Sequence, residues 1–138
     1  MNPVTGRPPD GAFKTPHLRN IELTAPYFHN GGQATLRQVV EFYNRGGDFP
    51  NQNVSGEIKS LNPSDEDIEA LVAFMRGLTD ERVRFERAPF DHPQILIPKG
   101  HVVGNGEQAE TILIEVPAVG RNGGARLPTF AEGLGELP

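Results

Sequence analysis

Histidines are the side chains of this sequence best suited to bind a metal or to move a proton near neutral pH. The chain has four of them, namely His17, His29, His92 and His101. They form no H-E-x-x-H motif and no other spacing typical of a metal site, which argues against a non-haem metalloenzyme. The chain contains no cysteine, so disulfides, thiolate metal sites and cysteine nucleophiles are excluded within it.

Sequence motifs of other enzyme classes are also missing. There is no G-x-S-x-G motif, and Ser55, Ser60 and Ser64 have no histidine in a known triad pattern. The Gly104-Asn105-Gly106 run lacks the following capped helix that a nucleotide-binding loop requires. The sequence therefore gives no support for a hydrolase or a nucleotide-binding protein.

Charge and hydrophobicity exclude further classes of partner. The net charge is -5, and charges of both signs are scattered along the chain, so neither nucleic acid nor an anionic membrane is an expected partner. No apolar run approaches the roughly 20 residues that span a bilayer. Met1 is followed by Asn2 and Pro3 rather than by a basic and then an apolar region, so we expect no export signal in this chain.

A first helix is predicted to start at Thr35. Thr35 and Gln38 match the T-x-x-Q capping box, in which each side chain accepts a hydrogen bond from the other residue's backbone. The apolar stripe of this helix has the spacing i, i+3, i+4 and i+7 and comprises Leu36, Val39, Val40 and Tyr43. Gly46 and Gly47 should end it, because glycine adopts the left-handed conformation without strain.

A second helix is predicted to start at Ser64, where three acidic residues favour the positive end of the helix dipole. Arg76 lies near its negative end. Its apolar face comprises Ile68, Leu71, Val72, Met75 and Leu78. Both stripes are expected to pack into a core.

The rest of the chain is predicted to be rich in loops, since it includes most of the 16 glycines and 13 prolines. Residues 1–34 should be irregular and held in place by Phe13, Leu18, Ile21, Leu23, Tyr27 and Phe28. Two β-prone runs, 95–97 and 111–116, are each stopped by a proline and separated by a turn over residues 100–106. They either pair as a short hairpin or lie on a neighbouring surface. The glycine-rich end from residue 120 is expected to fray.

Five stretches together resemble a known family. They are FKTPHLRN-x-x-LTAPYFHNG, ATLRQVVEFYNRGG, LNPSDEDIEALVAFMRGLTD, VRFERAPFDHPQILIPKG and ILIEVPAVGRNGG. In order and spacing they resemble the C-terminal haem domain, with its extension, of the bacterial dihaem cytochrome c peroxidases and their MauG-like relatives. The likeness covers residues 11–124. The family's C-x-x-C-H attachment motifs have no counterpart here, because the chain has no cysteine.

The resemblance implies roles for several residues. Tyr43 matches the axial-ligand position of the C-terminal haem, where MauG-like proteins have tyrosine and the peroxidases have methionine; the simpler alternative is a core residue. Arg19 matches a residue near the haem propionates, and His29 one near the interface of the haem domains. The resemblance also implies a calcium ion held by the backbone carbonyls at Thr24 and Pro26.

These observations predict a mostly α, loop-rich chain with an incomplete cytochrome c-type domain over residues 1–80. Residues 81–138 would form a C-terminal extension with a short β-hairpin. The leading hypothesis for its function is the C-terminal portion of a dihaem peroxidase or MauG-like protein, with haem c and calcium in the complete protein. A haem-bearing N-terminal domain or partner chain, an electron-donor protein and self-association are the expected interactions. The family is periplasmic. The alternative is a non-catalytic interaction fragment, or a decayed remnant without haem.

Overall fold

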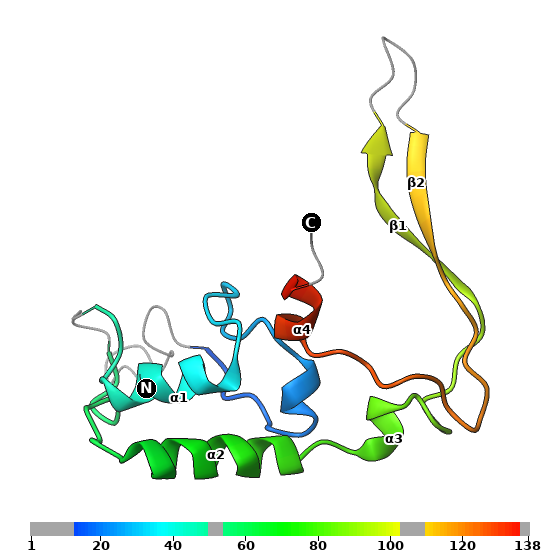
Figure 1. Ribbon diagram of the computed structural model, residues 1–138. Helices are drawn as coiled ribbons and strands as arrows, with labels where there is room; N and C mark the ends of the chain where they lie inside the picture. The colour runs from blue at the N-terminus through cyan, green and yellow to red at the C-terminus, as the bar shows by residue number, and fades with distance from the viewer. Residues whose placement is uncertain (1–12, 50–53, 103–109, 136–138) are drawn as a thin grey trace, which may run out of the picture. The chain divides into compact units, whose positions relative to one another are not determined.

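The computed structural model describes residues 13–49, 54–102 and 110–135 of the chain. These residues form four α-helices, one 3₁₀ helix and one two-stranded antiparallel sheet (Figure 1). The prediction of a mostly helical chain with a hairpin is confirmed. The chain divides into two compact units, Met1–Thr79 with Pro128–Pro138, and Asp80–Leu127. Within the described ranges, no helix has the length and apolar character needed to cross a membrane.

Helix α1 (Leu36–Asn44) begins and ends as the sequence predicts. The Thr35 hydroxyl accepts a hydrogen bond from the Gln38 amide at 3.2 Å, and the Gln38 side chain accepts one from the Thr35 amide at 3.1 Å. Beyond the helix, Gly46 and Gly47 have φ angles of 80° and 90°, in the left-handed region that favours glycine. Local chemistry therefore sets both ends of α1.

Helix α2 (Asp65–Gly77) also starts at a capping box, this time between Ser64 and Asp67. The Ser64 amide donates to the Asp67 carboxylate at 3.1 Å, and the Asp67 amide donates to the Ser64 hydroxyl at 3.2 Å. The hydrogen bond from the Ser64 hydroxyl, with a further one from its amide, lowers the pKa of Asp67. The carboxylate is thus held ionised at the positive end of the helix.

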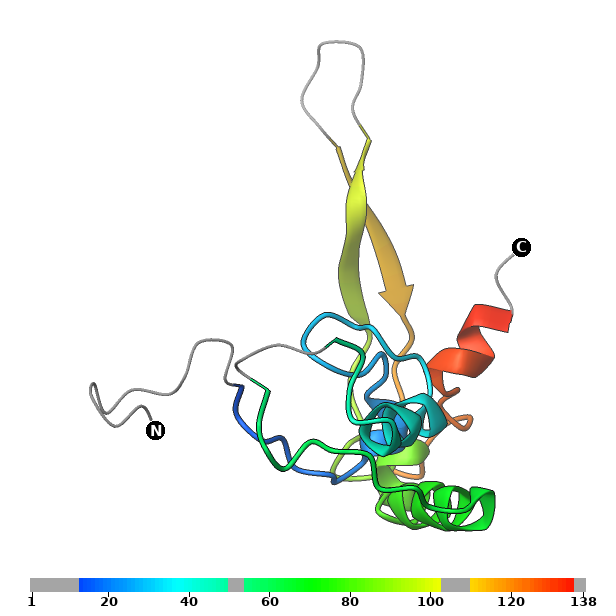
Figure 2. The same cartoon turned by 90° about the vertical axis from the view of Figure 1, so that its left-hand side faces the viewer.

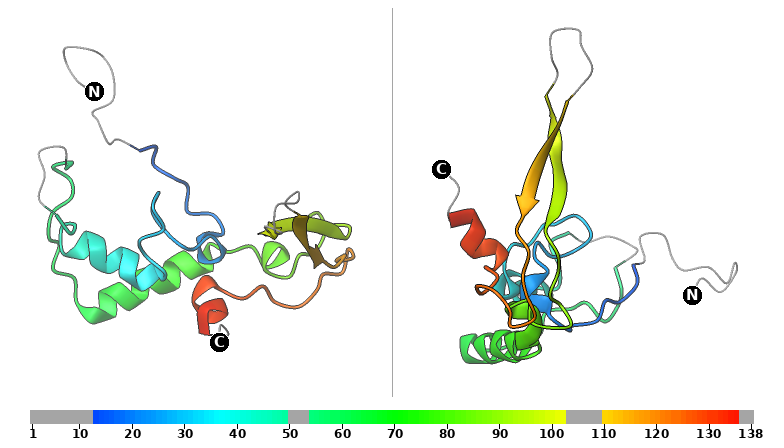
Figure 3. Two further views of the ribbon diagram at one scale, coloured as in Figure 1. Left: turned by 90° about the horizontal axis from the view of Figure 1, so that it is seen from above. Right: turned by 90° about the vertical axis from the view of Figure 1, so that its right-hand side faces the viewer.

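The core of the first unit lies where α1 packs beside α2 (Figures 1 and 3). Its buried residues are Tyr27, Leu36, Val72 and Met75, with Ile21, Val39 and Val40 packed against them. The prediction was wrong for Leu71, which is 48% exposed, whereas Val72 is 2% exposed. Consecutive helical residues lie about 100° apart around the axis, so the buried face follows Ile68, Val72 and Met75 and leaves Leu71 at its flank.

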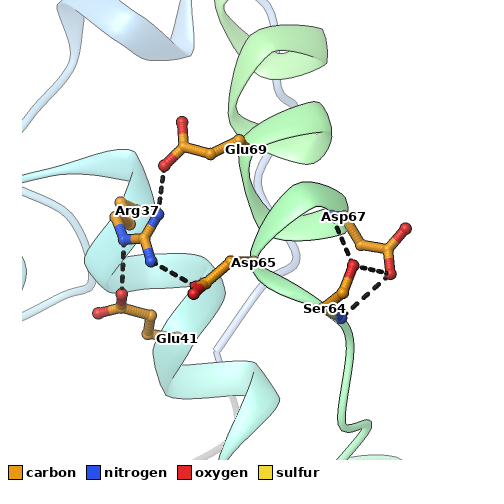
Figure 4. Close-up of polar contacts among 6 residues, drawn as sticks. All are labelled: Arg37, Glu41, Ser64, Asp65, Asp67 and Glu69. Carbon is orange, nitrogen blue, oxygen red and sulfur yellow. Dashed lines mark hydrogen bonds and ion pairs between the residues drawn. The ribbon is translucent and has the colours of Figure 1, made fainter.

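A charged cluster on the surface joins the same two helices. The Arg37 guanidinium on α1 pairs with Glu41 at 2.8 Å, with Asp65 at 2.8 Å, and with Glu69 (Figure 4). Hydrogen bonds to Glu69, then Asp65 and Glu41, raise the pKa of Arg37. Because one cation serves three carboxylates from two helices, the cluster favours one alignment of α1 on α2, although exposed ion pairs contribute little individually.

The segment before α1 is irregular, as predicted, apart from the 3₁₀ helix η1 (Ile21–Leu23). Tyr27 is buried and its hydroxyl donates to the Ile21 carbonyl at 2.9 Å. Burial, with the nearby Glu22 carboxylate, raises the pKa of Tyr27. Phe13 and Leu18 are exposed, so neither holds this segment by burial in the core. The Phe13 ring contacts the segment only by stacking on His29, among the described residues.

The end of the described chain also differs from expectation. Residues Phe130–Gly135 form a short helix, α4, in the first unit instead of a frayed tail. The Thr129 amide donates to the Glu132 carboxylate at 2.7 Å, and the Glu132 amide donates to the Thr129 hydroxyl at 3.4 Å. This T-x-x-E capping box was readable in the sequence and explains why a glycine-rich segment is ordered here.

The second unit contains α3 (Glu81–Arg84) and a hairpin of β1 (Ile95–Val102) and β2 (Glu110–Val116). The two β-prone runs therefore do pair with each other, and the hairpin is twisted along its length (Figure 2). The expectation that Pro98 stops the first run was wrong, and so was the turn at residues 100–102; the rest of the predicted turn, residues 103–106, lies outside the described residues. β1 continues through Pro98 because the register shifts between Pro98 and Gly100, and a bulge on an edge strand tolerates proline.

Apolar side chains occupy both faces of this hairpin. By the strand register and the alternation of side chains, one face carries Ile95, Ile97, Ile112, Ile114 and Val116. Leu96 and Leu113 lie on the opposite face and are more than half exposed. The isoleucines of the first face are also exposed, so the described residues of its own unit cover the hairpin on neither side.

Thr79, just beyond the end of α2, is buried, and its hydroxyl has no hydrogen-bond partner among the described residues. A buried hydroxyl without a partner opposes folding. We expect Thr79→Val, which keeps the shape and removes this group, to leave the free energy of unfolding unchanged or to raise it by up to about 1 kcal/mol. Chemical denaturation checks this, with Thr79→Ser as the control that keeps the hydroxyl. A clear loss of stability in Thr79→Val alone would show that the hydroxyl has a partner.

Candidate functional site

Tyr43 lies in the last turn of α1, at the outer end of the apolar stripe that Leu36 begins. Exposure increases along this stripe, from 5% at Leu36 to 45% at Tyr43, so the stripe runs from the core to the surface. Among the described residues, no group forms a hydrogen bond with the Tyr43 hydroxyl. The phenol oxygen is therefore accessible, and the Tyr43 ring is neither fully in the core nor fully in solvent.

Two phenylalanines support the Tyr43 ring. The Phe42 ring lies 5.3 Å from it at an interplanar angle of 89°, and the Phe28 ring lies 6.2 Å from it at 74°. The Phe28 and Phe42 rings are themselves 4.8 Å apart. We call Phe28, Phe42 and Tyr43 the aromatic cluster. Edge-to-face contacts of this kind hold rings in defined orientations, so the cluster fixes the direction of the phenol.

Phe28 joins the cluster from a strained position. Its φ angle is 67°, in the left-handed region that a bulky residue rarely adopts. The surrounding loop is closed by two hydrogen bonds between the backbones of Tyr27 and Gln33 and by one from the Gly31 amide to the Phe28 carbonyl. Strain of this kind persists only where the surroundings enforce it, and it often marks functional sites. The loop thus directs the Phe28 ring towards Tyr43.

The predicted haem-environment residues lie on the surface of the first unit. His29 follows Phe28 directly and is exposed, with its ring stacked on that of Phe13 at 4.0 Å. Arg19 is exposed, and its guanidinium has no partner among the described residues. The structure therefore brings His29 into the loop that contacts Tyr43, whereas no described contact links Arg19 to either residue.

The backbone carbonyls proposed for calcium are free to bind a ligand. Neither the Thr24 nor the Pro26 carbonyl oxygen accepts a hydrogen bond from any described residue. Thr24 instead uses its amide and hydroxyl as donors, both to the Ile21 carbonyl. The described ranges contain no group of three or more histidine, aspartate or glutamate side chains that could hold a metal ion. These two carbonyls alone make an incomplete site.

A haem fits the exposed aromatic surface better than the pocket of the first unit. The pocket has a volume of about 70 Å³ and is lined by residues such as Tyr27, Leu36, Arg76 and Phe130, but not by Tyr43. Cofactor sites typically have several hundred Å³. By contrast, the aromatic cluster offers apolar rings beside an accessible phenol oxygen, which suits one face of a planar macrocycle. The chain can thus supply one side of a haem site.

Sequence reasoning found Tyr43 but missed its two neighbours. Phe42 directly precedes Tyr43 and was not counted in the apolar stripe, and Phe28 is 15 residues before Tyr43 and reaches the site only through its left-handed backbone. No signal in the sequence marks that conformation. The F-Y pair at the end of a capped helix was the one readable indication of aromatic packing.

Comparison with curated proteins shows that this chain is similar to cytochrome c peroxidases and to MauG proteins. It is 46% identical over 69 residues to cytochrome-c peroxidase IdrP2 of Denitromonas iodatirespirans, which is 50% of this chain and 17% of that protein. It is 41% identical over 85 residues to cytochrome c551 peroxidase of Nitrosomonas europaea, covering 60% of this chain and 22% of that protein. Methylamine utilization protein MauG of Methylorubrum extorquens is 37% identical over 70 residues, 51% of this chain and 20% of MauG.

Other comparisons found no counterpart. No family model matches the chain, and no solved structure matches it. The chain spans about a fifth of the length of the curated relatives above. Both kinds of relative nevertheless match about half of it at some 40% identity. Over that half, this chain is similar to cytochrome c peroxidases and to MauG.

Proposed function

We propose that this chain works as the C-terminal part of a dihaem enzyme that uses peroxide to oxidise a protein or small-molecule substrate. The observation that supports the proposal is the similarity to cytochrome c peroxidases and MauG, together with an accessible, ring-supported tyrosine at the position that the sequence resemblance matches to an iron ligand. Haem c would supply the redox chemistry, attached through cysteines that lie outside this chain. A haem-bearing N-terminal domain or partner chain would provide them.

Tyr43 would set the chemical bias of the site. A phenolate is a hard, anionic oxygen ligand that stabilises ferric and higher oxidation states, whereas the thioether of methionine favours the ferrous state. The contacts with Phe28 and Phe42 hold the phenol in one orientation, which a ligand needs. Tyrosine at this position therefore favours oxidising chemistry over simple electron relay.

Exposed polar groups elsewhere in the first unit would complete the surroundings of the haem. Arg19 carries a guanidinium that is free, among the described residues, to pair with a propionate in a two-pronged contact. His29, stacked on Phe13, would lie at the junction with the haem-bearing domain. The free carbonyls of Thr24 and Pro26 would contribute to a calcium site whose remaining ligands come from that domain. The whole protein would act in the periplasm and receive electrons from a donor protein.

Purification and assay of the natural protein that carries this chain test the proposal. Purified with its partners, it should show the Soret band of haem and accelerate peroxide-dependent oxidation of a reduced small cytochrome. Chelating calcium should lower the rate of this oxidation. The 138-residue chain alone is the control: it should give no haem stain after denaturing electrophoresis, because it contains no cysteine. A natural protein without a Soret band would overturn the proposal, and haem without turnover would favour a non-catalytic interaction role.

A further inference from the structure

We call the segments just before β1 and just after β2, residues 88–94 and 117–121, the root of the hairpin. Backbone hydrogen bonds outside the strands join these two segments. The His92 amide donates to the Val119 carbonyl at 3.1 Å, and the Val119 amide donates to the His92 carbonyl at 2.9 Å. The Ala88 amide donates to the Arg121 carbonyl at 3.2 Å, so the segments before β1 and after β2 run side by side. His92 lies three residues before β1 and therefore marks the point where the hairpin leaves the rest of its unit.

Both nitrogens of the His92 ring face hydrogen-bond acceptors. Nδ1 lies 2.9 Å from the Pro93 carbonyl oxygen, and Nε2 lies 3.1 Å from a Glu86 carboxylate oxygen. A carbonyl oxygen and an ionised carboxylate can only accept hydrogen bonds, so each ring nitrogen must carry a proton to satisfy its contact. A neutral imidazole carries one such proton. The arrangement is therefore complete only when His92 is positively charged.

The pair is sheltered and its carboxylate is held in place. The side chains of His92 and Glu86 are 20% and 25% exposed. Glu86 adopts a left-handed φ of 50°. Two backbone hydrogen bonds close the turn around it: the Glu86 amide donates to the Val83 carbonyl, and the Arg87 amide donates to the Arg82 carbonyl at 2.7 Å. A strained turn that points a carboxylate at a histidine is a built contact rather than a passing surface pair.

The charged groups that act on the imidazole are carboxylates. The Pro93 carbonyl, then Glu86, with a smaller contribution from Asp91, raise the pKa of His92 above its ordinary value. The neighbouring cations are engaged elsewhere: the Arg87 guanidinium lies 4.9 Å above the Phe85 ring, and Arg84 pairs with Glu81. His92 thus faces two hydrogen-bond acceptors, one of them a carboxylate, and Asp91 adds a smaller negative contribution.

We infer that His92 and Glu86 form a pH-sensitive latch, which fastens the root of the hairpin when the imidazole is charged and loosens when it is neutral. A group whose folded pKa is raised stabilises the structure fully below its unfolded pKa, near 6.5 for histidine, and this contribution disappears as the pH rises through the folded value. The latch is therefore closed in mild acid and opens towards alkaline pH. What it controls is the mobility of a hairpin with two exposed apolar faces.

Nuclear magnetic resonance of the 138-residue chain tests the latch directly. The His92 ring signals should titrate with a midpoint above that of a histidine in an unstructured peptide. Over the same range, exchange of the Val119 amide, corrected for its intrinsic rate, should quicken by up to tenfold for each pH unit by which the midpoint is raised. Amides in the middle of the hairpin, such as that of Ile114, should respond less. Val119 protection that does not change through the His92 titration would overturn the proposal.

Substitution of the carboxylate separates the latch from general packing. Glu86→Gln keeps the size of the side chain and its ability to accept a hydrogen bond, but removes the charge, so the His92 midpoint should fall and the pH dependence of Val119 exchange should shrink. The matched control is Glu81→Gln, in the same unit, where the carboxylate pairs with Arg84 instead. Dispersed β2 amide signals verify that each variant is folded. Equal midpoints in Glu86→Gln and the unsubstituted chain would refute the latch.

Discussion

Replacing Leu36 with alanine should lower the free energy of unfolding of the first unit by about 2 to 5 kcal/mol, the usual range for truncating a buried leucine. Leu36 is 5% exposed and lies in the cluster with Tyr27, Val72 and Met75, where α1 meets α2. The deletion removes apolar contacts and leaves a cavity that rigid helices cannot fully close. Urea denaturation followed by circular dichroism measures the change, provided that the slope of the transition stays constant.

The control makes the same chemical change on the neighbouring helix. Leu71 on α2 is 48% exposed, so Leu71→Ala should change the free energy of unfolding by less than about 1 kcal/mol. The contrast between the two variants tests the arrangement of the helices as well as the burial of one residue. Equal losses would mean that the exposed flank of α2 is covered in solution, and the assignment of the core would then need revision.

The second large effect is expected at Tyr43, in the natural protein with its haem. If Tyr43 binds the iron as proposed, Tyr43→Met should raise the reduction potential of that haem by on the order of 100 mV, because a neutral, soft thioether replaces a hard anionic oxygen. Tyr43→Phe should remove the ligand altogether and change the absorption spectrum of the ferric protein. Redox titration followed by optical spectroscopy measures both changes.

The other tyrosine provides the comparison for this experiment. Tyr27 is buried and uses its hydroxyl to donate to the Ile21 carbonyl. Tyr27→Phe should therefore lower stability by about 1 kcal/mol and leave the haem spectrum and potential as they were. If Tyr43→Phe also leaves the spectrum and potential unchanged, Tyr43 is an ordinary residue of the aromatic cluster and not a ligand.

Features that depend on a few neighbouring residues could be predicted from the sequence. Thr35 with Gln38 located the start of α1, Ser64 located that of α2, and Gly46 with Gly47 located the end of α1. Each of these signals works through hydrogen bonds or backbone preferences within one helical turn. Thr129 and Glu132 form the same kind of cap at α4, but the glycines around this helix favour a frayed end, and the two signals in the sequence conflict.

Features that depend on distant neighbours could not be predicted in the same way. The spacing of Leu71 fits the apolar face of α2, but only the position of α1 decides which side of that face is covered. Pro98 stays in a strand because a partner strand and a bulge accommodate it. Tyr43 was found through the family resemblance, whereas its supporting Phe28 depends on a left-handed backbone that no local pattern indicates.

The capping boxes of α1 and α2 have a consequence for how this chain can change over evolution or by engineering. Because α1 and α2 each take their starting point from four consecutive residues, neither start depends on the length of the segment that joins the helices. Lengthening a loop costs only about 0.6 kcal/mol for each doubling of its length. Insertions in this connection that keep the hydrogen bond from the Leu61 amide to the Asn44 carbonyl should therefore be tolerated without moving the register of either helix, which makes the connection a suitable place to graft a tag, a probe or a binding peptide.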